Sequence, residues 1–146
     1  MKLTYLLLTG FLLILSSFSF AKTPITDKAL FETQLLNCFE KDDIQQCLPP
    51  LIQKYYRRDF TDDEMKRVIT VYKAWLGTDH VYTIHKIRNT KVAEFYDEKI
   101  YLIEDTTGSV MLMILGMRSI NGPWYINNIS FSSKEAEISK VLGINP

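Results

Sequence analysis

The spacing of apolar residues changes from helical to alternating near the middle of the chain. From Asp27 to Gly77 they recur every three or four positions, and after Gly77 every second position. The first part predicts a helix over Asp27–Glu40, then a short turn over Ile44–Leu48. A further helix is predicted over Leu51–Arg58, because Pro49-Pro50 disfavours helical geometry in the residue before each proline.

A third helix is predicted from the clearest local signal in the chain. Thr61-Asp62-Asp63-Glu64 has the form of a capping box, in which a threonine hydroxyl and a glutamate carboxylate each satisfy a free backbone amide. Gly77 stands where a glycine with positive φ commonly ends a helix. The apolar stripe predicted to face the core comprises Met65, Val68, Ile69, Tyr72 and Leu76.

Five segments after this helix have the composition and the alternation of β-strands. Turn-forming residues separate them, including Asn89-Thr90, Asp97-Glu98 and Asn121-Gly122. Asn-Gly tolerates positive φ at both central positions of a type I′ turn, so it predicts a hairpin between the last two strands. The predicted strands are Val81–Ile87, Val92–Tyr96, Ile100–Ile103, Val110–Arg118 and Trp124–Phe131.

The end of the chain predicts one more helix, and one strand departs from simple alternation. Ser132-Ser133-Lys134-Glu135 is a second possible capping box, and it opens a short helix that Gly143 would end. The run Val110–Leu115 is apolar on both faces, although an antiparallel strand with one solvated face alternates. The second face is therefore expected to be covered by the last helix, by a partner subunit or by a ligand, and we favour dimerisation.

Helices followed by an antiparallel meander predict an α+β domain. We expect N-terminal helices packed on a curled antiparallel sheet of four to five strands, with a short C-terminal helix. The whole of residues 22–146 is expected to form this single domain, since no linker or repeat interrupts it.

The first 21 residues have the pattern of a secretory signal peptide. A basic start at Lys2 precedes an apolar run over Leu3–Leu15, and small residues at Ser19 and Ala21 mark a cleavage site. Cleavage would release residues 22–146 as a periplasmic or secreted protein. The alternative is a retained membrane anchor, since the apolar stretch is nearly long enough to span a bilayer.

Charge and cysteine content fit an exported protein without a polyanionic partner. The chain has 17 basic and 17 acidic residues, so it carries no excess charge for binding nucleic acid. Cys38 and Cys47 are the only cysteines, and an oxidising compartment favours a disulfide between them. The alternative is a pair of buried free thiols. A redox-active pair is not expected, because Cys-x-x-Cys spacing is absent.

The closing hairpin gives the chain a resemblance to a known superfamily. A turn glycine, a tryptophan and alternating apolar residues follow one another in Asn121-Gly122-Pro123-Trp124-Tyr125-Ile126-Asn127-Asn128-Ile129. With the export signal and the helices before the sheet, the chain resembles small exported members of the nuclear transport factor two-like superfamily, which is also called ketosteroid-isomerase-like. A cystatin-like sheet is the nearest competitor.

The resemblance implies a cone-shaped fold with a pocket inside the cone, frequent dimers and no single activity. Its isomerase branch uses a pocket aspartate as base, with a tyrosine and a protonated acid as hydrogen-bond donors. No motif in this chain maps that set, so no catalytic residue is carried over.

His85 is the candidate general base among the two histidines. It would share a strand face with Val81, Thr83 and Ile87, and so could point into a pocket. The alternative is a hydrogen-bonded structural or surface histidine. His80 would face the opposite side of the sheet, which argues against a metal site shared by the two.

Methionines and aromatic residues supply the other candidates. Exported copper carriers use methionine thioethers, but Met111, Met113 and Met117 lie in a continuous apolar run, where packing is favoured. We therefore expect no metal and no cofactor. Tyrosines and tryptophans on a concave sheet suit a pocket or an interface. The predicted ligand or interface residues are Tyr72, Tyr82, Met111, Met113, Trp124 and Tyr125.

The favoured interpretation is a non-enzymatic exported binding module, dimeric, whose partner is a protein or a small apolar ligand. A secretion accessory, a secreted effector and an immunity protein all fit. The alternative is an isomerase- or dehydratase-like enzyme with a pocket acid or histidine. Its carboxylate candidates are Asp97, Glu94 and Glu104, although Asp97 resembles a turn residue. A third hypothesis is a domain tethered to an envelope complex by a retained leader.

Overall fold

The computed structural model describes residues 22–41 and 43–144. The predicted signal peptide, residues 1–21, lies outside the described residues. Within the described ranges, no helix is long and apolar enough to cross a membrane.

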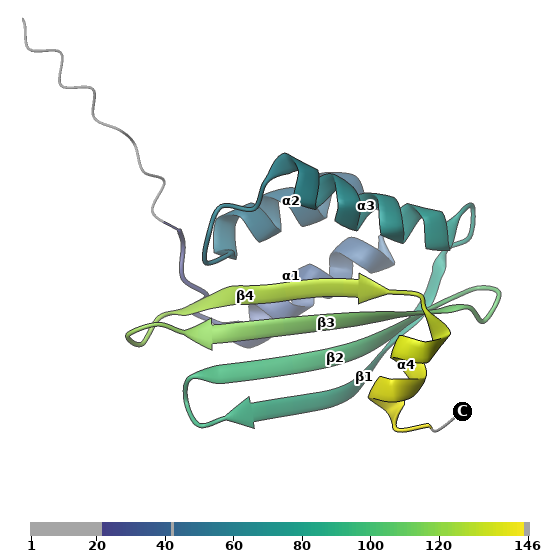
Figure 1. Ribbon diagram of the computed structural model, residues 1–146. Helices are drawn as coiled ribbons and strands as arrows, with labels where there is room; N and C mark the ends of the chain where they lie inside the picture. Colours follow the sequence, from purple (N-terminus) through teal and green to yellow (C-terminus); the bar gives the residue numbers. More distant parts are fainter. Residues whose placement is uncertain (1–21, 42, 145–146) are drawn as a thin grey trace, which may run out of the picture.

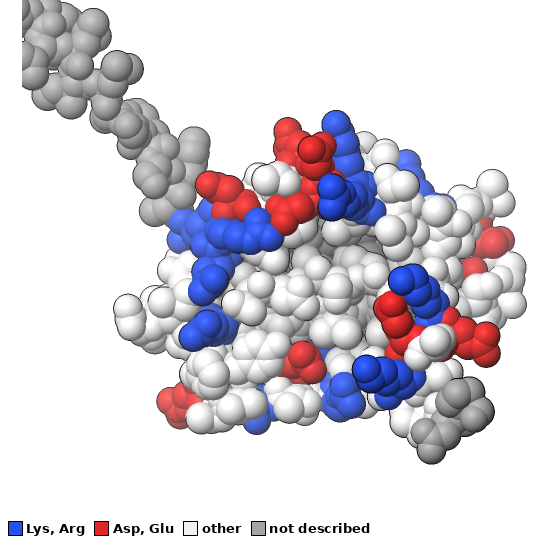
Figure 2. All heavy atoms as spheres, viewed as in Figure 1, with Lys and Arg blue, Asp and Glu red and all other residues white. Residues whose placement is uncertain are grey.

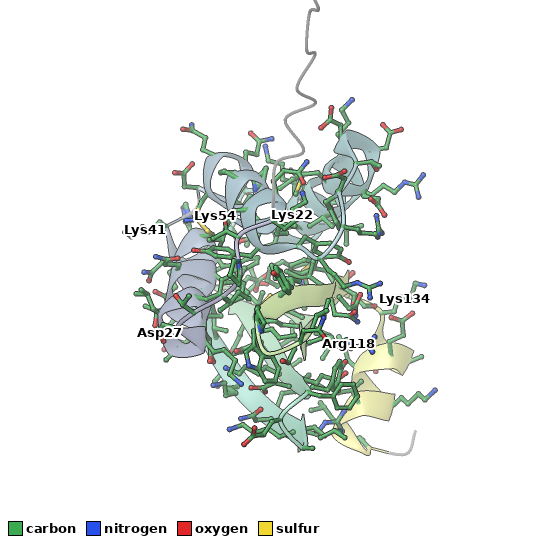
Figure 3. The ribbon with its side chains drawn as sticks, turned by 90° about the vertical axis from the view of Figure 1, so that its left-hand side faces the viewer. Lys22, Asp27, Lys41, Lys54, Arg118 and Lys134 are labelled. Atoms are coloured by element: carbon green, nitrogen blue, oxygen red, sulfur yellow. A yellow bond between two sulfur atoms is a disulfide. The ribbon has the colours of Figure 1, made fainter. Side chains whose placement is uncertain are left out.

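Three N-terminal helices cover one face of a four-stranded antiparallel sheet, and a short C-terminal helix lies on the other (Figures 1 and 3). The α+β class is therefore confirmed. In chain order the elements are α1 (Lys28–Glu40), α2 (Ile44–Tyr55), α3 (Asp62–Leu76), β1 (Val81–Val92), β2 (Tyr96–Asp105), β3 (Val110–Ser119), β4 (Trp124–Ser132) and α4 (Glu135–Leu142).

The helix α2 differs from its prediction. It runs without a break through Pro49 and Pro50, so the predicted turn over 44–48 and the separate helix over 51–58 are wrong. Each internal proline removes a backbone hydrogen bond and costs stability. Burial of one side of α2 outweighs this cost: Ile44, Leu48 and Ile52 are all at most 3% exposed.

The capping box of α3 is confirmed. The Thr61 hydroxyl accepts a hydrogen bond from the Glu64 amide at 3.2 Å, and the Thr61 amide donates to Oε2 of Glu64 at 2.9 Å. Gly77 follows the helix with a φ of +61°. At α4 the expected capping box is not formed, since Lys134 is the N-cap and makes no side-chain cap, but Gly143 does end that helix in the left-handed conformation.

The sheet is an open meander, β1-β2-β3-β4, and the prediction that it curls is wrong. The outer edge of β4 already holds other backbone: Ile25 donates its N–H to the Trp124 carbonyl at 2.7 Å, and Arg57 donates to the Ile126 carbonyl at 2.9 Å. These contacts occupy the edge that a closed cone would need to bring toward β1. The remaining edge strand, β1, carries Lys86, Arg88 and Lys91, and charged residues of this kind discourage pairing with other chains.

The first hairpin is longer than predicted. Asn89 and Thr90 lie inside β1, and the chain turns at residues 93–95, where Ala93 has a φ of +46°. The predicted strand Val92–Tyr96 is therefore wrong, and so is the expected turn at Asp97-Glu98. Asp97 lies in β2 opposite Lys91, and its side chain is buried on the face that α1 covers.

The third hairpin, which joins β3 to β4, agrees with its prediction. Asn121 and Gly122 both have positive φ, +54° and +106°, as a type I′ turn requires. The Ile120 amide donates to the Pro123 carbonyl at 2.8 Å and closes the turn. Trp124 thus enters β4 at a fixed position beside Ile25.

Side chains fill the space between the helices and the sheet. Met111, Met113, Leu115 and Met117 of β3 are fully buried there. The ring of Phe39 on α1 meets that of Tyr72 on α3 edge-on, with centroids 5.4 Å apart. The three methionines on this face therefore serve as core residues.

The helix α4 accounts for the apolar second face of β3. Its Ile138 packs on Ile100 and Leu112, and all three are buried. Of the three covers that the sequence allows for this face, the last helix is the one found in the structure. A dimer is not needed to explain the pattern of this strand.

The predicted disulfide joins Cys38 on α1 to Cys47 on α2, nine residues apart. Cys38 is fully buried beneath α2. The bond cross-links two successive helices, so it limits the separation of these two segments in the unfolded chain.

Loss of this disulfide should lower the free energy of unfolding by about 2–3 kcal/mol, the chain-entropy value for so short a loop. Urea unfolding of the wild type with and without a reductant isolates the cross-link, because both sulfur atoms stay in place. The Cys38→Ala/Cys47→Ala variant should lose more than the reduced protein, because it also leaves a cavity where the buried Cys38 sulfur lies. Unfolding midpoints that do not respond to reductant would contradict this role.

Gly116 on β3 packs closely against the side chain of Tyr96 on β2, and substitution at this position tests that contact. A Cβ at this position would lie 2.8 Å from the Tyr96 hydroxyl, whereas the next atoms are at least 3.5 Å away. That hydroxyl donates to Glu98 at 3.1 Å. Gly116→Ala should therefore cost about 1 kcal/mol, as overpacking commonly does, and clearly less in a Tyr96→Phe background. An equal cost in both backgrounds, from thermal unfolding, would show that the hydroxyl is not the obstacle.

Candidate functional site

A pocket of about 370 Å³ opens at the end of the sheet where the two hairpin turns meet the start of α1. Figure 3 looks onto this end, with Asp27 labelled where α1 begins. Residues from α1, all four strands and the turns after β1 and β3 line it: Lys28, Lys91, Ala93, Glu94, Tyr96, Asp97, Ser119, Gly122 and Trp124.

Local structure fixes the three residues at the back of the pocket. Lys28 is the first residue of α1, because the Asp27 carboxylate caps the helix by accepting from the amides of Ala29 and Leu30, both at 2.9 Å. Asp97 projects from the helix-covered face of β2. Trp124 begins β4 directly after the tight turn.

The Lys28 ammonium group lies between an acid and an aromatic ring. Its Nζ is 3.0 Å from Oδ2 of Asp97 and 3.7 Å from the centre of the Trp124 ring. A cation over the face of tryptophan is attracted by the ring's quadrupole. Lys28 thus links the three elements, and it covers one face of the indole.

The other oxygen of Asp97 has no such partner. The residue is 1% exposed, and no donor in the described part of the chain forms a hydrogen bond with its Oδ1. A buried polar atom without a partner costs free energy, so native structures rarely retain one. Among the described carboxylates, only Asp97 has a buried oxygen in this condition.

Two further charges lie around the pocket. Lys91 is directly opposite Asp97 in the β1–β2 ladder, and Glu94 is in the turn that follows β1. Both are exposed, and within residues 22–41 and 43–144 neither makes an ion pair. The pocket lining therefore holds two cations and two anions, of which only Lys28 and Asp97 are paired with each other.

A second charged cluster continues the contact between α1 and β2. Glu32, one helical turn after Lys28, accepts from Lys99 of β2 and Lys86 of β1. It also accepts a 2.5 Å hydrogen bond from the Tyr101 hydroxyl. Asp97, Lys99 and Tyr101 are alternate residues of β2, so the charges of one helix face match those of one strand face.

This cluster changes the acidity of its members. Burial alone would raise the pKa of Glu32, but the hydrogen bonds from Lys86, Lys99 and Tyr101 outweigh it and lower that pKa to about 2. Burial, reinforced by the neighbouring Glu32 carboxylate, raises the pKa of Tyr101 well above its usual range. Glu32 therefore stays ionised, and Tyr101 stays a hydrogen-bond donor.

Of the six ligand or interface residues predicted from the sequence, only Trp124 lies in this pocket. Tyr72, Met111 and Met113 are core residues and at most 1% exposed. Tyr82 lies at an irregularity in β1 and is 73% exposed. Tyr125 is opposite Arg118, half-buried, on the sheet face away from α1. The structure does not bring the six together.

His85 also faces away from the three N-terminal helices. It pairs with Leu102 of β2. It does not share a strand face with Val81 as predicted, because the β1–β2 ladder shifts register between Val81 and Thr83. Its Nε2 is 3.0 Å from Oε2 of Glu104, and the two side chains are 54% and 31% exposed. This is a surface pair on a sheet face and not a histidine within a pocket.

Sequence reasoning missed Lys28 and Lys91 as site residues and placed Asp97 in a turn. One signal could have corrected the last point: Asp97, Lys99 and Tyr101 alternate with Ile100 and Leu102 in a single strand pattern. Nothing local marks Lys28, whose role depends on the packing of α1 against β2.

No protein-family model, no curated protein and no solved structure matches this chain. The site must therefore be interpreted from its own geometry.

Glu32→Gln should make stability depend less on pH. The folded-state pKa of about 2 lies below the ordinary value of 4.5, so Glu32 stabilises the fold fully above pH 4.5 and loses this effect as pH falls toward 2. At pH 7 the variant should lose about 3 kcal/mol, because Lys99 is left buried without its anion.

Urea unfolding between pH 2 and pH 7 measures this difference. Glu40→Gln, an exposed change at the end of the same helix, is the matched control and should unfold like the wild type at every pH. If the gap between wild type and Glu32→Gln stays constant from neutral to acidic pH, the ion cluster does not have the assigned role.

Proposed function

We propose that this protein is an exported, non-enzymatic binding module whose ligand occupies the pocket between Lys28, Asp97 and Trp124. The observation that carries the proposal is the buried Oδ1 of Asp97, which lacks a hydrogen-bond donor in a residue that lines an open pocket. A bound ligand that supplies the missing donor would remove the free-energy cost of that atom.

The surroundings favour a polar ligand over the small apolar one expected from the sequence. Four charged side chains line the pocket, and the space between the helices and the sheet is filled by buried residues such as Met113 and Tyr101. A ligand is therefore accommodated at the end of the sheet and not within a cone. A few placed polar groups beside an aromatic ring are typical of a small-molecule site.

The enzyme alternative has weaker support. Asp97 is the buried carboxylate among the pocket residues, and its neighbour Tyr96 is the tyrosine that an isomerase-like arrangement would use. However, Asp97 is paired with Lys28, and the Tyr96 hydroxyl donates to Glu98. His85 is on the other side of the sheet. The arrangement provides for holding a ligand more readily than for transferring a proton.

The remaining parts of the proposal rest on separate observations. Export to the periplasm or medium is supported by the pattern of residues 1–21 and by the Cys38–Cys47 disulfide. Helices that precede an antiparallel sheet are compatible with a distant nuclear transport factor two-like relationship. Figure 2 shows a largely uncharged centre on the face that carries α4, and this surface is the second candidate, for a protein partner or a second copy.

The test is a screen of chemically diverse small molecules by ligand-observed NMR. The protein is expressed with its own N-terminal segment and purified in the form that the cell produces. We expect at least one compound to bind, and Asp97→Asn to abolish its binding. Arg88→Ala, an exposed change on β1 outside the pocket, is the control and should bind normally. Intact mass should show loss of residues 1–21.

Two results would contradict the proposal. Binding that survives Asp97→Asn, in a variant that circular dichroism shows to be folded, would place the ligand elsewhere. A screen in which no compound binds the wild type would remove the small-molecule function. A retained N-terminal segment would overturn only the release of residues 22–146 and would favour a domain tethered to the envelope.

A further inference from the structure

We infer that the ligand of this pocket is a free α-amino acid, held as a zwitterion with its ammonium group on Asp97 and its carboxylate beside Lys91. The inference rests on the proposed function and names the chemical class that the pocket selects. Two features of the lining carry it, namely the unsatisfied acceptor and the balance of charges.

The acceptor requires a donor that the protein does not supply. Oδ1 of Asp97 is buried without a partner, whereas Oδ2 is already 3.0 Å from Lys28. A second ammonium group on the free oxygen would form a charge-assisted hydrogen bond, which is stronger than a neutral one. Because Oδ1 is buried, a donor reaches it only after a shift of the side chains around it, and a small ammonium group requires the smallest shift.

The charge balance disfavours a simple cation. Lys91 stands opposite Asp97 in the ladder, where cross-strand neighbours have their Cβ atoms roughly 5 Å apart, yet it makes no ion pair with a described residue. It therefore presents an unpaired positive charge close to the free acceptor. With Lys28, Glu94 and Asp97, the lining sums to zero, so a ligand that carries both charges a short distance apart is complementary to it.

The position of Trp124 argues against a sugar as the ligand. Sugar recognition by stacking requires an open aromatic face, but Lys28 Nζ already lies 3.7 Å from the centre of this ring, and the residue also packs against the core cluster. The indole thus contributes an apolar wall and not a stacking platform. An amino acid needs only such a wall for its side chain.

The experiment titrates each of the standard amino acids, one at a time, into the ¹⁵N-labelled protein and follows the two tryptophan indole signals. The indole of Trp124 should shift in a saturable way, whereas that of Trp75, which lies on α3 away from the pocket, should not. The best-binding amino acid is then compared with its N-acetyl derivative and with its carboxamide.

Removing the ligand's ammonium by acetylation should weaken binding by about tenfold or more, the usual effect of losing one charged hydrogen bond. Lys91→Ala should weaken binding of the amino acid, because it removes the cation beside the ligand's carboxylate. Binding of the carboxamide should be unchanged, because the carboxamide has no carboxylate for Lys91 to attract. Arg88→Ala should affect neither. Lys91 is exposed on an edge strand, so this variant is expected to fold.

The outcomes separate the two proposals. If no amino acid shifts the Trp124 indole while other compounds bind and need Asp97, the amino-acid inference is wrong and the binding function stands. If the N-acetyl derivative binds as tightly as the free amino acid, the ammonium does not lie on Asp97 and the inference is again wrong. If nothing binds, both proposals fail.

Discussion

The contact between α1 and β2 is the constraint on which the candidate site depends. Lys28 and Glu32 are one turn apart on the helix, and they meet Asp97 and Lys99, two residues apart on the strand. The order of charges on the helix matches that on the strand, so a shift of α1 by one turn would place Lys28 near Lys99. Such buried pairs add little net stability, but removing one partner is costly, and they can therefore fix how two elements dock.

The contact that positions α1 also leaves Oδ1 of Asp97 without a hydrogen-bond donor. Lys28 can satisfy only one oxygen of Asp97, because its ammonium is also held over the Trp124 ring. Ile25, just before α1, donates a backbone hydrogen bond to the Trp124 carbonyl. This bond keeps the start of the helix at the end of the sheet. The pocket is therefore a consequence of how the helix, the hairpins and β4 meet.

Local signals predicted the parts of the fold that are controlled locally. The capping box at Thr61, the Asn121-Gly122 turn and the Cys38–Cys47 bridge need only neighbouring residues or compartment chemistry, and all three are found. The failures concern competition with tertiary packing: burial carries α2 through its prolines, and pairing with β1 holds Asp97 in a strand. The site itself could not be predicted, because it requires Lys28 and Asp97, which are 69 residues apart, to meet.

A crystal structure of the protein purified from its own cells, without added ligands, tests the central claim most directly. The account predicts electron density of an organic ligand with a donor within hydrogen-bond distance of Oδ1 of Asp97, and Lys28 on Oδ2. A water molecule or a protein donor on Oδ1, or an Asp97 side chain turned away from Lys28 into solvent, would contradict it.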